Sequence, residues 1–281
     1  MAIRFSRPIQ SKPRGRSPFS VKSIDLHERG EYVSPIAALD DFRVSGRPFP
    51  PHPHAGFSAV TYVFEDSVGD LRSGDSLGND IRTGPGGIVW TQAGRGVMHH
   101  EVPAQLDREL HGAQFFVNLS ARNKLIEPRV LSLDGKDVPE WQSDRGDRVR
   151  VVVGNYAGIS SPLIPAEPFT LLDAEVRWKV PLDLQPDQYG LVYVQSGYVR
   201  LETDAATVSL ASSHAATIQG DGFFSIVAEQ SARILFLAGI VIHDQVVTHG
   251  PFMMNDASQV NDAIERYQAG HMGRLAPLSE N

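Results

Sequence analysis

Seven short segments rich in β-branched and aromatic residues set the strongest limit on how this chain can fold. Each is five to seven residues long, which is a typical strand length and too short for most helices. Clusters of Gly, Pro, Asp, Asn and Ser separate them, and the 25 glycines and 19 prolines suit many tight turns. The pattern predicts an all-β sandwich or barrel rather than alternating βαβ units. The segments are 58–64, 113–119, 149–153, 176–180, 190–195, 198–203 and 233–239.

A polar stretch at 132–148 interrupts the strand series and is the best candidate for a domain boundary. The 281 residues are enough for two domains of ordinary size. We expect an N-terminal domain over 1–131, a linker over 132–147 and a C-terminal domain over 148–281.

Each half also carries a Gly-rich turn before a late strand, at 84–87 and at 219–222, which weakly indicates two copies of one fold. One helix is predicted near the C-terminus. Val260, Ile264 and Tyr267 form an apolar stripe there, and Asp256 with Gln259 resembles a capping box.

Composition excludes several classes of protein. A formal charge of -7 provides no general attraction to nucleic acid or anionic lipid, and the absence of cysteine excludes thiolate and disulfide chemistry. The first residues lack the apolar core of a secretory signal, and the longest apolar run, 236–242, is too short to span a bilayer. We therefore expect a cytoplasmic protein without a membrane or nucleic-acid partner. A basic N-terminal arm could contact a protein partner, but a solvated tail is the simpler interpretation; its residues are Arg4, Arg7, Lys12, Arg14, Arg16 and Lys22.

Two pairs of donor residues point to a metal site. In an extended strand, His52 and His54 share one face, and so do His99 and Glu101 in the segment 94–103. Three imidazoles and one carboxylate suit Fe(II), Mn(II), Ni(II), Co(II) or Zn(II).

The remaining histidines have simpler interpretations. Strand alternation is the only reason to prefer His99 over its neighbour His100. Hydrogen bonding in the core or a surface position suits His111, His243 and His249, and nothing singles out His27, His214 or His271.

Several segments resemble the signature motifs of the pirin family, which belongs to the cupin superfamily. They are "HPHAGFSAVTYVFE", "DSLGN", "GPGGIVWTQAGRGVMHHEVP", "HGAQFFVNL" and "HGPFMMN". The resemblance implies two cupin β-barrels packed face to face, a bicupin, with a short C-terminal helix. It also implies a non-haem metal in the N-terminal barrel, usually iron, bound by His52, His54, His99 and Glu101. The C-terminal barrel is expected to hold no metal, since its segment "SLASSHAATIQGDG" offers only His214.

The chain departs from the family at two positions. Pirins usually have Arg directly after the second histidine and Glu three residues further on, whereas this chain has Ala55 and Ser58. Glu101 is then the only carboxylate that the motifs assign to the metal.

The resemblance implies two functions of different classes. The first is a quercetin 2,3-dioxygenase, which opens a flavonol ring with O2. Glu101 would take the 3-hydroxyl proton, and Phe57, with Phe115 or Phe116, would line an apolar mouth for a flat substrate. The second is a non-catalytic regulator that binds a transcription factor or a metabolic enzyme.

Overall fold

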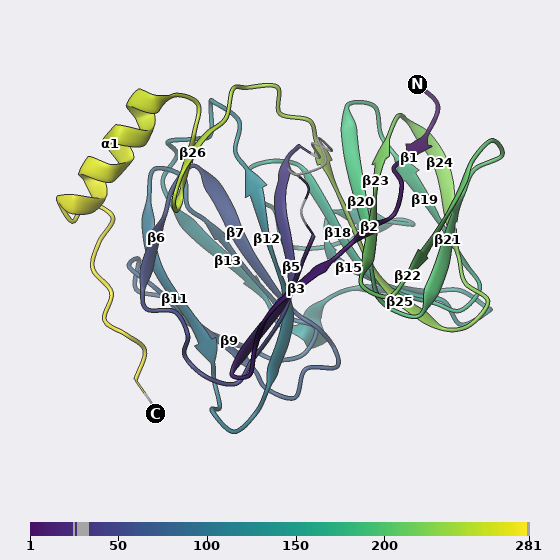
Figure 1. The fold of residues 1–281 in the computed structure, drawn as a ribbon, viewed down its shortest axis with the longest axis horizontal. Coiled ribbons are helices and arrows are strands. Elements are labelled where there is room, and N and C mark those ends of the chain that lie inside the picture. Colours follow the sequence, from purple (N-terminus) through teal and green to yellow (C-terminus); the bar gives the residue numbers. More distant parts are fainter. Residues whose placement is uncertain (25, 27–33, 280–281) are drawn as a thin grey trace. The chain divides into compact units, whose positions relative to one another are not determined.

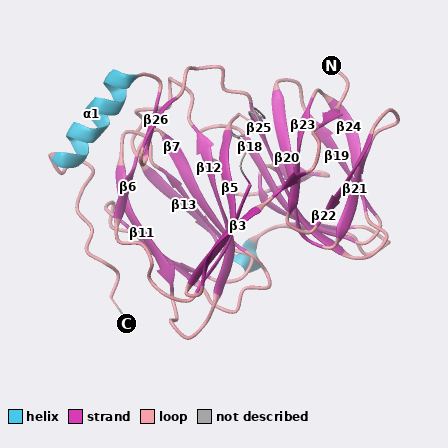
Figure 2. Cartoon of the chain, in the orientation of Figure 1, coloured by secondary structure: helices cyan, strands magenta, loops and turns pink. Residues whose placement is uncertain are grey.

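The computed structural model describes residues 1–24, 26 and 34–279, and this part of the chain is mostly β-structure with one α-helix (Figures 1 and 2). The predicted all-β class is thus confirmed. Contacts divide the chain into two compact units, each built from three segments. The first unit comprises Arg14–Val21, Leu39–Asp137 and Ile242–Asn281; the second comprises Met1–Pro13, Lys22–Ala38 and Val138–Val241.

The first unit is built mainly from a seven-stranded sheet, in the order β13-β10-β7-β12-β5-β4-β3, and a four-stranded sheet, β6-β11-β8-β9. A hairpin, β26-β27, and the helix α1 complete it. The bounds are β3 Lys12–Arg16, β4 Phe19–Ile24, β5 Ile36–Val44, β6 His52–His54, β7 Phe57–Val63, β8 Leu71–Asp75, β9 Asp80–Thr83, β10 Ile88–Gln92, β11 Val97–Pro103, β12 Leu110–Asn118, β13 Arg129–Leu133, a 3-10 turn at Gly135–Asp137, β26 Val247–His249, β27 Phe252–Met254 and α1 Ala257–Gln268.

The second unit has an eight-stranded sheet, β1-β23-β20-β25-β18-β15-β14 with β2 also paired to β23, a four-stranded sheet, β19-β24-β21-β22, and the hairpin β16-β17. The bounds are β1 Arg4–Phe5, β2 Ile9–Gln10, β14 Glu140–Gln142, β15 Arg148–Val153, β16 Asn155–Tyr156, β17 Ile159–Ser160, β18 Phe169–Val176, β19 Lys179–Leu184, β20 Gln188–Ser196, β21 Tyr198–Glu202, β22 Thr207–Ala211, β23 His214–Gln219, β24 Gly222–Val227 and β25 Ala232–Ile240.

The two units repeat one topology. The eight consecutive strands β5 to β12 pair in the same order as β18 to β25: β10-β7-β12-β5 corresponds to β23-β20-β25-β18, and β6-β11-β8-β9 to β19-β24-β21-β22. The sequence indicated two copies of one fold, but the two Gly-rich turns on which that prediction rested are not equivalent. The turn at 84–87 precedes β10, whereas that at 219–222 precedes β24, the counterpart of β11.

The bounds of the two compact units can be compared with the predicted boundaries 1–131, 132–147 and 148–281. The segment 132–147 contains the end of β13, the 3-10 turn and β14, and residues 242–281 belong to the first unit. That the predicted segments fold as separate domains stays a prediction.

Two local expectations are wrong. The segment 176–180 is not one strand but spans the end of β18, a turn and the start of β19; in the turn, the backbone N–H groups of Arg177 and Trp178 donate to Asp147. The N-terminal arm is not a free tail, because β1 and β2 pair with β23.

The helix α1 begins where predicted. Asp256 accepts a hydrogen bond from the backbone N–H of Gln259, as an N-cap does, and the Gln259 side chain accepts from the N–H of Asn255. Val260 and Ala263 are buried in a cluster with Ala55, which follows β6, and with residues of β11 and β27, while Tyr267 is 43% exposed. The helix thus covers the outer side of the strands that carry the histidines.

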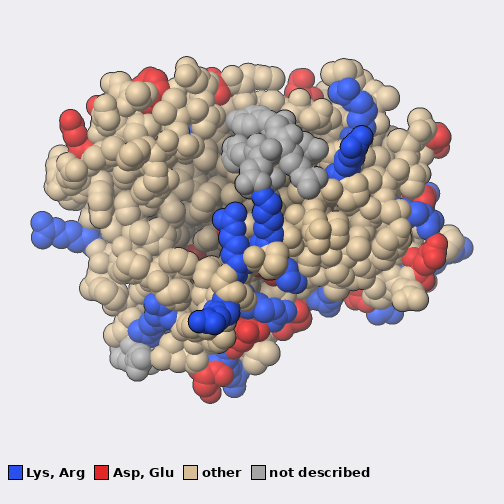
Figure 3. Space-filling view, in the orientation of Figure 1, with Lys and Arg blue, Asp and Glu red and all other residues tan. Residues whose placement is uncertain are grey.

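No helix in the described ranges is both long and apolar enough to cross a membrane. On the face drawn in Figure 3, basic and acidic side chains form small groups on a mainly uncharged surface.

Candidate metal centre

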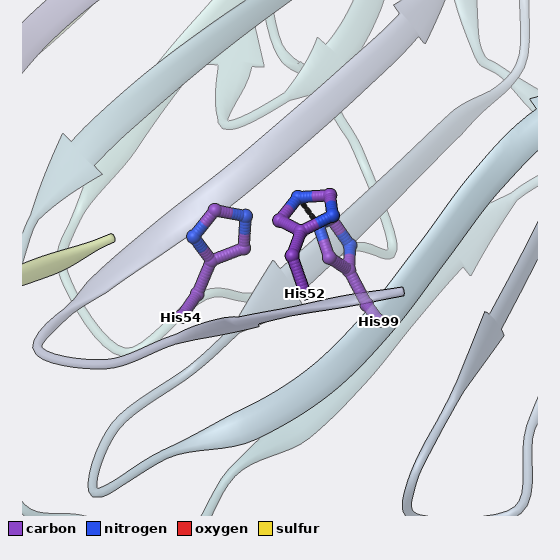
Figure 4. Close-up of side chains that lie close together, drawn as sticks. All are labelled: His52, His54 and His99. Carbon is purple, nitrogen blue, oxygen red and sulfur yellow. Dashed lines mark hydrogen bonds between the residues drawn. The ribbon is translucent and has the colours of Figure 1, made fainter. Parts of the chain in front are cut away.

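Three histidines converge because of the register between β6 and β11. His52 lies directly opposite His99, and His54 lies two residues further along β6 on the same face. The ring centroids are 4.5 Å apart for His52–His99 and His54–His99, and 4.8 Å apart for His52–His54. Figure 4 shows the three rings gathered above the strands that carry them. Three of the four predicted donors therefore share one place.

The positions of the nitrogens fit a metal ion. One nitrogen from each ring lies within 4.8 Å of the others, and the Nε2 atoms of His52 and His99 are 3.0 Å apart. Two imidazoles bound to one ion at about 2.0–2.1 Å and at right angles would have their nitrogens roughly 3 Å apart. The Nδ1 of His52 is 2.9 Å from the carbonyl oxygen of Pro50, to which it can donate, so that its Nε2 keeps a lone pair for the centre.

Burial keeps the rings of His54 and His99 neutral, as a metal ligand must be. Burial, and then the charge of His52, lowers the pKa of His54 to about 3. Burial, and then His54, lowers the pKa of His99 well below its ordinary value. Within the described part of the chain, the Nδ1 atoms of both rings are buried without a hydrogen-bond partner. Buried polar atoms without a partner are uncommon in folded proteins.

The turn after His54 is fixed by contacts with distant segments. Gly56 has φ = 83°, and a Cβ there would lie 1.9 Å from the carbonyl oxygen of Met253, so only glycine fits. Lys124 is completely buried, and its ammonium donates to the carbonyl oxygens of Gly56 at 2.8 Å and Met253 at 2.9 Å, as well as to the Asn118 side chain. Lys124 thus joins the histidine turn, β12 and β27. No sequence pattern predicted this role of Lys124.

His100 faces away from the cluster. Its Nε2 lies 3.0 Å from the carbonyl oxygen of Phe49, and its Nδ1 accepts from the backbone N–H of Leu278 at 3.0 Å. One ring nitrogen therefore contacts the segment before β6, and the other contacts the C-terminal segment.

Glu101 lies on the same strand face as His99, but its carboxylate is not part of the three-histidine group. It accepts a hydrogen bond from the Thr61 hydroxyl at 2.6 Å. Burial raises the pKa of Glu101 to about 7, and hydrogen bonds from Thr61 and Ser73 act in the opposite direction. Sequence reasoning did not identify these two hydroxyl partners.

Aromatic rings border the cluster on one side. Phe57 is buried, and its ring centroid lies 5.0 Å from that of His54 and 4.8 Å from that of Phe116. Phe116 is half-buried and 5.9 Å from His54. Phe115 is on the other face of β12, fully buried against Trp90. Of the two alternatives, Phe116 is thus the one beside the histidines.

The other histidines lie elsewhere. His111 is buried between Asp41 and Asp66, with ring nitrogens 2.9 and 2.8 Å from their carboxylates. His243, His249 and His271 are exposed; His214 begins β23 and contacts the carbonyl of Ser212; His27 lies outside the described residues.

The second unit has no equivalent donors over Lys179–Leu184 and Gly222–Val227, the strands that correspond to β6 and β11. The buried, inward-facing residues there are all apolar: Val180, Leu182, Leu184, Phe224 and Ile226. Their side chains offer no metal ligand.

These features define a protein with two cupin domains, of which the first carries a three-histidine cluster suited to a divalent metal. The Pirin family matches residues 4–117, and the pirin C-terminal cupin domain matches residues 171–273. The chain belongs to the pirin family.

Two relatives show the range of names within this family. A Pseudomonas aeruginosa protein provisionally named a quercetin 2,3-dioxygenase is 33% identical over 85% of this chain and 87% of its own length. Human pirin is 31% identical over 83% of this chain and 80% of its own length.

Solved structures share the fold. A quercetin 2,3-dioxygenase from Acinetobacter baumannii superposes with a TM-score of 0.84 at 24% identity, covering 97% of this chain and 99% of that one. A bacterial pirin from Escherichia coli, in complex with nickel(II), gives a TM-score of 0.67 at 18% identity, with 86% and 100% coverage.

Proposed function

We propose that this chain is a metal-dependent dioxygenase that opens the ring of a flavonol such as quercetin. The observation that carries the proposal is the group of three imidazoles, two of them buried, whose nitrogens lie within 4.8 Å of one another beside two phenylalanines. The provisional dioxygenase name of the Pseudomonas aeruginosa relative supports the choice of substrate class.

In this proposal His52, His54 and His99 hold the metal, with Glu101 as a fourth ligand or a base. Iron(II) is the first candidate, and Mn, Ni, Co and Zn are the alternatives. A divalent ion there would supply Lewis acidity toward the 3-oxygen of a flavonol and reactivity toward dioxygen.

The chain's own residues would bind and deprotonate the substrate. Phe57 and Phe116 would stack on a flat ring system and keep water from it. Glu101 would accept the 3-hydroxyl proton, which suits a carboxylate whose burial brings its pKa to about 7. Thr61 would hold that carboxylate in place.

The test is aerobic turnover of quercetin by protein loaded separately with each metal. We expect loss of flavonol absorbance and release of carbon monoxide with at least one metal, and neither with His54→Ala. Absence of turnover with every metal, in protein shown to be loaded, would remove the proposal.

A non-catalytic regulator is the second candidate, and one observation favours it. This chain has Ser58 at the position where pirins usually have Glu. The carboxylate of Glu101 accepts hydrogen bonds from Thr61 and Ser73 and is not grouped with the histidines. A loaded but inactive protein would then form a complex with a transcription factor or metabolic enzyme. That complex should depend on the metal and be lost in His54→Ala; a complex unaffected by metal removal would contradict this candidate.

A further inference from the structure

The second unit has an open cavity, although its strands lack the histidines that the first unit carries. A pocket of about 710 Å³ lies among residues of β14, β16, β18, β19, β24 and β25. That volume is within the usual range for small-molecule sites, about 300–1,000 Å³. Leu182 of β19, an inward-facing position of the strand that corresponds to β6, forms part of the wall.

The lining is aromatic and apolar inside and carries amides at the rim. Leu172, Phe236 and Ala238 are buried members of the unit's core that nevertheless face the pocket. Trp141 and Tyr156 lie edge to face, with ring centroids 5.4 Å apart, and the Tyr156 hydroxyl donates to the carbonyl oxygen of Pro181. These rings present flat surfaces that suit a planar ligand.

The polar residues that line the pocket indicate which kind of ligand it can bind. None of the described lining residues is Lys, Arg or His, so the pocket provides no cation for an anionic ligand. Its carboxylate, Asp183, already accepts a hydrogen bond from the Gln185 side chain. Asn155 and Gln188 bring further amide groups to the wall, which suit hydroxyl or carbonyl groups of a neutral molecule.

Phe223 is the least expected member of the wall. It is 79% exposed, although its neighbour Phe224 is buried. An exposed phenylalanine at the mouth of an aromatic pocket adds contact area for a ligand that enters.

We propose that this pocket binds a neutral, planar aromatic molecule, so that the second unit is a ligand-binding cupin rather than an inert copy of the first. The pocket and the histidine cluster have no residue in common, and binding here needs no metal.

The test uses the full chain and N-phenyl-1-naphthylamine, an uncharged aromatic dye whose fluorescence rises in apolar sites. We expect saturable binding of one dye per chain, unchanged after the metal is removed. Ala238→Phe, which fills the pocket, should weaken binding by roughly tenfold or more.

Phe223→Ala should weaken binding severalfold, and it tests the pocket without disturbing the core. Tyr198→Ala is its matched control, because Tyr198 is 51% exposed in the same unit and does not line the pocket. Circular dichroism and metal content report whether each variant is folded.

Phe57→Ala separates this site from the one beside the histidines. If Phe57→Ala weakens dye binding while Phe223→Ala leaves it unchanged, the dye occupies the histidine site and the proposal is wrong. The proposal is also wrong if the unmodified protein shows no saturable binding of the dye. Failure of flavonol turnover alone bears only on the proposed function.

Discussion

His99 and His100 are neighbours with opposite orientations, and substitution can distinguish them. His99→Ala removes one of three converging imidazoles. We expect it to weaken metal binding by more than the roughly 10- to 100-fold that loss of an outer partner costs. His100→Ala should leave metal content near that of the unmodified protein, because the ring of His100 contacts Phe49 and Leu278 instead. Metal analysis after dialysis is the measurement; the reverse result would mean that the strand register is wrong by one residue.

Glu101→Gln tests whether the carboxylate is a base. Glutamine keeps the shape but cannot accept a proton, so turnover per bound metal should fall about 100- to 10,000-fold. Flavonol that is already ionised at higher pH should recover much of the rate. If turnover per bound metal is unchanged with neutral flavonol, Glu101 is not the base. Thr61→Val, which removes a hydroxyl partner of this carboxylate, is the companion variant.

At the scale of residues, the sequence predicted what strand alternation decides. Alternation put His52 and His54 on one face and chose His99 over His100, and the structure brings those three together. The partners of Glu101 could not be predicted, because Ser73 meets β11 through its pairing with the distant strand β8, and Thr61 lies in β7, a strand of the other sheet. Side-chain hydrogen bonds of this kind have no local pattern.

At the scale of elements, the buried Lys124 joins three segments distant in sequence, and this can be tested. Lys124→Met keeps most of the volume but leaves the carbonyls of Gly56 and Met253 without their donor. A buried group left unsatisfied costs about 1–3 kcal/mol, so we expect that loss in the free energy of unfolding and weaker metal binding. Denaturant unfolding and metal titration measure the two effects.

Lys136→Met is the control for Lys124→Met, because Lys136 is exposed in the 3-10 turn of the same unit. It should change neither quantity. Equal behaviour of the two variants would show that Lys124 does not support the histidine turn.

The presence of strands was predicted more accurately than the residues at which they begin and end. Six of the seven apolar segments lie almost wholly within a single strand, since a pattern of β-branched and aromatic residues depends on local sequence. The exception, 176–180, starts at the end of β18 and finishes in β19. The chain turns between them at Arg177 and Trp178, because Asp147, some thirty residues earlier, binds their N–H groups. No local pattern reports such a distant acceptor.

At the scale of the whole molecule, the two units should differ in metal content. The inward positions of β19 and β24 are apolar, so we expect about one metal per chain. His214→Ala should not change this number. A value near two, reduced to one by His214→Ala, would reveal a second site. Elemental analysis against protein concentration gives the answer.

Removing the metal should also lower stability. A ligand that binds only the folded chain stabilises it by about 2.7 kcal/mol when present at 100 times its Kd. We therefore expect a chelator to lower the Tm of the unmodified protein and to have little effect on His54→Ala. Equal shifts in both would show that the chelator acts elsewhere.

The exchange of chain ends between the units has a consequence for anyone who wishes to express one unit alone. Pro251, whose carbonyl accepts from the N–H of Ala55, and Met253, whose N–H donates to the carbonyl of Ala55, are encoded more than a hundred codons after the histidines themselves. A gene fragment that stops after residue 137 would therefore produce a first unit without β27, α1 and the carbonyl partner of Lys124. A fragment that starts at residue 138 would likewise lack β1 and β2. To express the first unit alone, a designer must join residues 242–281 to residues 39–137; for the second, N-terminal residues must be joined to 138–241, since neither half of the gene encodes a complete unit.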